Sequence, residues 1–183
     1  MTRRLQSSVL AIAGAVLAVS ELTTSAAAHV TVQPADAAAD SYAQLTFTVP
    51  HGCDGSATKA LRVKLPDGIL SAKPQMKPGW QVQIKTRKLD AAVAGPHGKS
   101  VSEVVDEVDW RGGPLPDNLY DTFGLVVRLP DKVGQVLYFP AVQECEKGVS
   151  RWIEIPAAGQ SEPRHPAPGL KLLPAARIMS VLP

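Results

Sequence analysis

The sequence has few of the residues that mark a strongly charged or aromatic binding surface. Its 183 residues include 19 Lys and Arg against 17 Asp and Glu, two cysteines, four histidines and nine Phe, Trp and Tyr. The near-neutral charge and the absence of a Lys/Arg block argue against nucleic acid as a partner. The small number of aromatic residues gives no sign of a flat surface for a glycan.

The sequence also has no motif for acyl transfer or for binding a phosphate. The segments "GPHG" at 95–98 and "RGGP" at 111–114 are typical of turns, and no helix follows them to direct amides at an anion. Several carboxylates between Glu103 and Asp109 could suggest a glycosidase. Their crowding on one predicted strand favours a solvated face, because a catalytic pair needs a defined separation across a cleft.

A long apolar run occurs only near the start of the chain. A basic start at 1–4, an apolar run at 9–19 and "AAA" at 26–28 predict a signal peptide over residues 1–28, cleaved after Ala28. The run is shorter than the roughly 20 residues of a membrane span. We therefore expect a periplasmic or secreted protein that begins at His29, with a formal charge of +1 and no membrane span after processing.

The processed chain has the pattern of an all-β protein. Apolar and polar residues alternate in "SYAQLTFTVP", "KALRVKLP" and "WQVQIKTRKL", and segments rich in Pro and Gly separate such stretches. Seven or eight short strands predict a one-domain antiparallel β-sandwich, immunoglobulin/cupredoxin-like, over residues 29–158. The Pro-rich segment 159–183 is expected to run extended along this domain.

Cys53 and Cys145 are the only cysteines. An even number of cysteines in an exported chain favours a disulfide, here between an early and a late strand end. Both thiols could instead be metal ligands. Each stands alone, however, without the paired spacing of a thiolate site.

His29 would become the first residue after cleavage. Its free amine and its ring Nδ1 could then chelate one metal, and both are nitrogen donors of the kind that Cu(II) prefers in tetragonal sites. The alternation in "HVTVQP" indicates a strand that could hold the amine at the end of a sheet. Alternatively, His29 is a solvated terminal histidine without a metal.

Six segments carry a resemblance to a known family across essentially all of the processed chain. They are "AHVTVQP" at 28–34, "TFTVPHGCDGSAT" at 46–58, "KPGW" at 77–80, "VDWRGGPLPD" at 108–117, "YDTFGLVVRLPD" at 120–131 and "LYFPAVQECEKGVSRWIEIP" at 137–156. In order and spacing they resemble the YcnI-like copper-binding domain family of exported bacterial proteins. The resemblance implies a β-sandwich that holds one Cu(II) per chain in a brace from a single N-terminal histidine, beside a tryptophan and a carboxylate.

The resemblance assigns the brace to His29 and the tryptophan near the metal to Trp152. It leaves the carboxylate open, because this chain has Thr122 where relatives often have Glu. Glu107 is the first candidate for the carboxylate ligand, and Asp121 and Glu154 are alternatives. Trp152 could also be a packing residue of its strand.

The function implied is copper buffering or delivery by a protein that is not an enzyme, with another exported copper-handling protein as a partner. One alternative is a copper-dependent redox enzyme or accessory, which would need a second histidine facing the first. His51, His97 and His165 are each expected to be surface histidines instead. Another alternative is an exported scaffold module without a metal.

Overall fold

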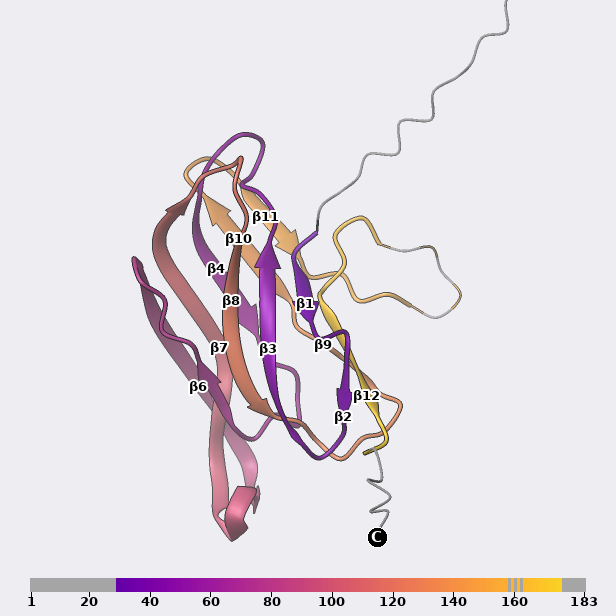
Figure 1. Ribbon diagram of the computed structural model, residues 1–183. Helices are drawn as coiled ribbons and strands as arrows, with labels where there is room; N and C mark the ends of the chain where they lie inside the picture. Colours follow the sequence, from indigo (N-terminus) through magenta and orange to yellow (C-terminus); the bar gives the residue numbers. More distant parts are fainter. Residues whose placement is uncertain (1–28, 158, 160, 162, 176–183) are drawn as a thin grey trace, which may run out of the picture.

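The computed structural model describes residues 29–157, 159, 161 and 163–175 as a single all-β domain (Figure 1). The predicted signal peptide and the last residues of the Pro-rich segment lie outside this part. The described part contains twelve strands and one short 3-10 turn: β1 (Thr31–Gln33), β2 (Asp36–Ala38), β3 (Tyr42–Val49), β4 (Thr58–Lys64), β5 (Ala72–Pro74), β6 (Trp80–Ala94), η1 (Pro96–Gly98), β7 (Ser100–Leu115), β8 (Asp121–Arg128), β9 (Val136–Tyr138), β10 (Ala141–Cys145), β11 (Val149–Trp152) and β12 (Gly169–Leu173).

The strands form two large sheets and a smaller third one. The order is β1-β3-β8-β5 in one sheet, β11-β10-β4-β7-β6 in the second, and β2-β12-β9 in the third. All pairs are antiparallel except β2 with β12. The predicted sandwich is confirmed, and it has more strands than expected because β2, β5 and β9 are only three residues long.

Period-two patterns place the core where the sequence predicts it. Leu45, Phe47 and Val49 of β3 are fully buried, as are Leu61 and Val63 of β4. Successive side chains of a strand point to opposite faces, so these residues form one inward row on each sheet. The two rows meet in a common apolar core between the sheets.

The alternation of apolar residues in β6 predicts their burial less accurately than the alternation in β3 and β4 does. Val82 packs against the core, but Ile84 is 50% exposed. β6 is the edge strand of its sheet, and with β7 it forms a long hairpin that extends beyond the other strands (Figure 1). No facing sheet covers the far part of the hairpin, so its apolar side chains stay in contact with solvent.

The Pro-rich segment contributes more to the domain than a division at residue 158 implies. Gly169–Leu173 forms β12, and its Leu170 and Leu172 are fully buried in the core. β12 pairs with both β2 and β9 and closes one side of the sandwich. The folded domain therefore extends at least to Leu173. The short alternation in "GLKLL" is the sequence signal for this strand.

The predicted disulfide between Cys53 and Cys145 is confirmed, with the two Cα atoms 6.0 Å apart. It joins the loop after β3 to the end of β10, across 92 positions of the sequence. Ser150 donates to Cys53 Sγ at 3.6 Å, so the bridge also contacts β11. Within the described residues, no cysteine is free to be a metal ligand.

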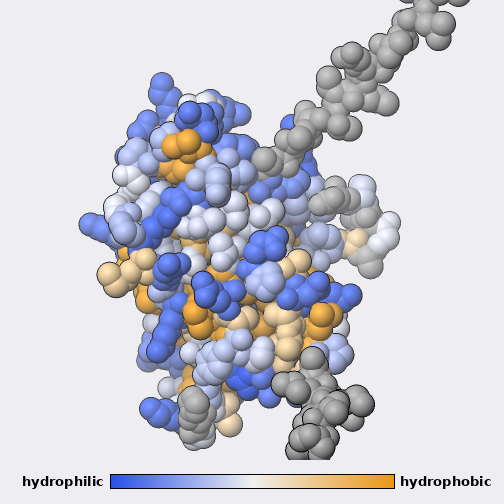
Figure 2. Space-filling view, viewed as in Figure 1, coloured by the Kyte–Doolittle hydropathy of each residue, from blue (hydrophilic) through white to orange (hydrophobic). Residues whose placement is uncertain are grey.

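Exposed hydrophobic residues form separate patches on a largely hydrophilic surface (Figure 2). The most exposed of them are Met76 at 88% and Tyr120 at 71%. Within the described part of the chain, no helix is long and apolar enough to cross a membrane.

Candidate metal centre

His29 lies two residues ahead of β1, where an edge of one sheet approaches an edge of the other. β1 pairs with β3 through Thr31 and Thr48, which places His29 near the end of β3. The ring of His29 is partly buried, and its Nε2 is fully buried without a hydrogen-bond partner. A buried polar atom without a partner is costly and unusual, so this ring nitrogen needs an explanation.

Trp152 contacts the ring of His29 from the other sheet. It is the last residue of β11 and is 6% exposed. The rings of His29 and Trp152 meet edge to face, with their centroids 5.3 Å apart. An imidazole N–H directed at an aromatic face is weakly stabilised there. If Nε2 takes this role, Nδ1 remains for another partner. The predicted neighbours His29 and Trp152 are therefore in contact.

Gln143 holds Trp152 in place. This residue of β10 is 1% exposed, and its Oε1 accepts from Trp152 Nε1 at 3.3 Å. Its Nε2 donates to the carbonyl of His51 at 2.7 Å and to Thr58 Oγ1 at 2.8 Å. Gln143 is not among the site residues that the sequence predicts. The available signal was a polar residue on the inward face of "AVQEC", where Ala141 is also buried.

We expect Gln143→Leu to destabilise the fold by about 1–3 kcal/mol, because it leaves the buried N–H of Trp152 and the carbonyl of His51 without partners. The measurement is the free energy of unfolding in urea. Gln44→Leu is the matched control: Gln44 lies on the exposed face of β3, and its replacement should change stability by less than about 0.5 kcal/mol. Equal stabilities of the two variants would contradict the assigned role.

Glu107 lies away from His29. It is on β7, and three strand intervals of the order β11-β10-β4-β7 separate β7 from the strand of Trp152, about 14 Å at the usual spacing. Its neighbour Val108 points into the core, so Glu107 faces outward. Its carboxylate accepts from Lys85 Nζ at 2.5 Å. The structure does not bring Glu107 to the brace residue.

The outward face beside Glu107 carries a network of charges. Asp109 is 1% exposed, and burial raises the pKa of its carboxyl above its ordinary value. Arg111 offsets part of this effect by donating from Nε to Asp109 Oδ2 at 2.7 Å. Glu144 joins the network through Arg62 at 2.6 Å and Arg111 at 3.3 Å. Asp106 and Glu107 of β7 pair with basic side chains of the neighbouring strands, and Asp109 pairs with Arg111 of its own strand.

The alternative carboxylates lie at different distances from the brace residue along the sheets. Asp121 is the first residue of β8, which lies two strands away from β1, and it pairs with Val49 of β3. Lys77 Nζ donates to the carboxylate of Asp121 at 2.6 Å. Glu154 follows Trp152 by two residues, and its Oε2 accepts from the backbone N–H of His165 at 2.7 Å. Glu154 is therefore the candidate carboxylate adjacent to the tryptophan.

His165 also reaches the tryptophan. Its exposed ring lies edge to face with Trp152, at 5.4 Å between centroids. The expected surface position is correct, because the side chain is exposed, but nothing in the sequence indicated this contact. A Pro-rich segment without alternation does not show where it returns to the domain.

The residues around Trp152 suit a metal with a preference for nitrogen donors. No group of three His, Cys, Asp or Glu side chains that could hold a metal occurs in the described part of the chain. A brace would not need such a group, because the amine of a processed His29 is a backbone atom. The nitrogen that such a brace would use is Nδ1, because Nε2 is buried on the protein side of the ring.

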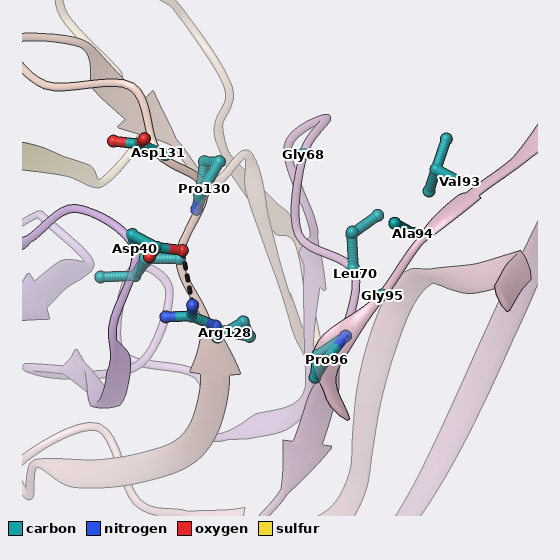
Figure 3. Close-up of a pocket in the computed structure, with 11 residues that line it drawn as sticks. Asp40, Gly68, Leu70, Val93, Ala94, Gly95, Pro96, Arg128, Pro130 and Asp131 are labelled. Carbon is teal, nitrogen blue, oxygen red and sulfur yellow. Dashed lines mark hydrogen bonds and ion pairs between the residues drawn. The ribbon is translucent and has the colours of Figure 1, made fainter. Parts of the chain in front are cut away.

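A pocket of about 420 Å³ lies at the opposite end of the sandwich (Figure 3). Asp40 and Arg128, which line it, form an ion pair at 2.5 Å near the start of β3, whereas His29 lies near the end of that strand. Val93 and Pro96 of the long hairpin form another wall. Neither His29 nor Trp152 lines this pocket, so it is separate from the candidate centre.

Comparisons with known proteins support the fold and show similarity to a copper-binding protein. Residues 29–172 match a family described as a domain of unknown function, DUF1775. The copper-binding protein CutI of Bacillus subtilis (strain 168) is 31% identical over 116 residues, which is 63% of this chain and 50% of that protein. The chain thus spans about half the length of this curated relative.

A solved structure supports the architecture. An uncharacterized protein from Nocardia farcinica with an immunoglobulin-like fold is 30% identical, with a TM-score of 0.60, and the match covers 79% of this chain and 98% of that one. The family match begins at His29 and includes all but the last residue of β12. On this evidence the chain belongs to the DUF1775 family, and the YcnI-like relationship that its motifs indicate is confirmed.

Proposed function

We propose that this protein binds one Cu(II) through the amine and the imidazole of His29, after cleavage at Ala28 outside the cytoplasm, and that it buffers copper or delivers it to another exported protein. The observation that carries the proposal is the contact of His29 with Trp152, in which the ring is held across the two sheets. The relative CutI is described as a copper-binding protein, which supports the choice of metal.

Two features of the chain support a rigid chelate. β1 is paired into its sheet from Thr31, which limits the movement of the residues just ahead of it. Trp152, fixed by Gln143, packs on the ring of His29 and excludes water from one side. Among the carboxylates, we assign Glu154 in place of Glu107 to the surroundings of the metal, because it follows Trp152 in the chain.

A chain that begins at His29 should take up one equivalent of Cu(II), and His29→Ala should lose this uptake because it removes the imidazole of the chelate. The measurement is metal content after gel filtration, with electron paramagnetic resonance to detect nitrogen donors. His51→Gln is the control, since the ring of His51 contacts the carbonyl of Gly52 instead. Absence of copper from the parent chain would favour the metal-free scaffold.

The redox alternative is tested with the same material. A buffer or carrier should be reduced by ascorbate once per bound copper, without further oxygen uptake. Sustained oxygen consumption or peroxide formation by the loaded protein would instead indicate a redox enzyme, and would contradict the proposed role.

A further inference from the structure

We propose that the disulfide between Cys53 and Cys145 sets the copper affinity of the candidate centre, and that Gln143 is the positioning residue through which it acts. This inference rests on the proposed function and names what regulates the same site. Gln143 is not a metal ligand in this account. It holds Trp152 against His29, so the protein binds copper tightly only while the bridge is intact.

The bridge joins the same two sheets that meet in the contact of His29 with Trp152. His29 leads into β1, which pairs with β3, and Cys53 lies in the loop that follows β3. Trp152 is the last residue of β11, which pairs with β10, and Cys145 is the last residue of β10. The covalent link therefore ties together the two strands that flank the candidate centre.

Gln143 connects the bridge to the indole. It lies on β10 two residues before Cys145, and its Oε1 accepts from Trp152 Nε1 at 3.3 Å. Its Nε2 donates to Thr58 Oγ1 at 2.8 Å, and that oxygen lies 3.7 Å from Cys145 Sγ. Because a disulfide sulfur carries no proton, Thr58 is the donor in this contact. A continuous row of contacts thus runs from the bridge to the ring that touches His29.

The other sulfur of the bridge bears on the same residues. Gln143 Nε2 also donates at 2.7 Å to the carbonyl of His51, two residues before Cys53. Ser150 Oγ donates to Cys53 Sγ at 3.6 Å, and Ser150 is the residue of β11 that pairs with Gln143. Both halves of the bridge therefore support Gln143 and the strand that ends at Trp152.

Burial makes the geometry of this network strict. Thr58, Gln143, Cys53 and Trp152 are all buried. The indole N–H can only donate and the carbonyl of His51 can only accept, so one orientation of the Gln143 amide satisfies both partners. A buried polar group without its partner is costly, which opposes any other orientation. The position of the indole beside His29 is therefore determined by Gln143 and by the bridge that supports it.

The test measures Cu(II) affinity, by competition with a chelator of known affinity, for chains that begin at His29. Gln143→Leu removes the amide and should weaken binding by about 10- to 100-fold, as is typical when a group that orients a ligand is lost. Cys53→Ser combined with Cys145→Ser should weaken binding by a similar factor. The electron paramagnetic resonance spectrum of loaded Gln143→Leu should keep the nitrogen donors of the parent, because no ligand is removed.

Two further variants separate positioning from a general loss of stability. Thr58→Val keeps the shape of the side chain but removes the hydroxyl between the bridge and Gln143, and it should also weaken binding. Ile69→Val is the control. It removes a methylene from the core beside Gly68 and Leu70, which line the pocket at the opposite end of the sandwich (Figure 3). It should lower the melting temperature and leave the copper affinity unchanged.

The outcomes separate this inference from the proposed function. If folded Gln143→Leu, or the folded chain without the bridge, binds copper as tightly as the parent, the inference is overturned and the proposed function stands. An equal loss of affinity in Ile69→Val would also overturn it, because the effect would then follow stability alone. If the parent takes up no copper, the proposed function fails as well.

Discussion

A chain that carries one additional methionine ahead of His29 should bind Cu(II) about 10²- to 10⁴-fold more weakly than a chain that begins at His29. The added residue converts the amine to an amide, which is a poor donor at neutral pH. The ring then binds alone, without the high effective concentration that links the two donors of a chelate. Titration of both forms with Cu(II), followed by competition with a chelator, measures the difference.

The two forms should otherwise be the same protein. The ladder of β1 begins at Thr31, so an added residue ahead of His29 does not touch it. Their thermal unfolding without metal should coincide. Equal affinities and equal electron paramagnetic resonance spectra would mean that the amine is not a ligand, and the brace would have to be abandoned.

Removal of the disulfide should have the largest effect on stability. Cys53→Ser combined with Cys145→Ser opens a loop of 92 positions, which costs about 4–5 kcal/mol in the chain-entropy account. For a domain of this size, that is a fall in the melting temperature of about 10–20 °C. Differential scanning calorimetry of the double variant beside the parent measures this fall.

A reductant provides the control for this prediction. It should lower the melting temperature of the parent to that of the double variant and leave the variant unchanged. Thr58, which lies 3.7 Å from Cys145 Sγ, also bonds to Gln143, so loosening this end of β10 should disturb Trp152 as well. A double variant as stable as the oxidised parent would show that the bridge contributes nothing to the fold.

Much of the fold follows from local patterns. Alternation in "AQLTFTV" predicts the inward row of β3. Successive side chains of a strand point to opposite faces, so the apolar positions are the ones that face the core. The buried Trp152 between the exposed positions Arg151 and Ile153 follows the same rule. β12 was missed because its five residues stand within a segment whose prolines hide a short alternation.

The candidate site also has features that the sequence predicts and features that it does not. The position of His29 after "SAAA" and its pairing with Trp152 in the family motifs can be read from the chain, and the structure places these two rings in contact. The ranking of the carboxylates could not be read from it. Strand order separates Glu107 from Trp152, and period two in a strand carries no information about which strands lie next to it.

The sequence by itself determined the class of fold, the inward residues, the disulfide partners and the histidine that cleavage would expose. Only the tertiary structure decided which polar groups meet at Trp152: Gln143 beneath it, Glu154 after it and His165 beside it. The physical reason is that burial and turns are set by neighbours along the chain. The contacts around Trp152 are set by segments that topology brings together, here those just ahead of β1 and β12 and the end of β11.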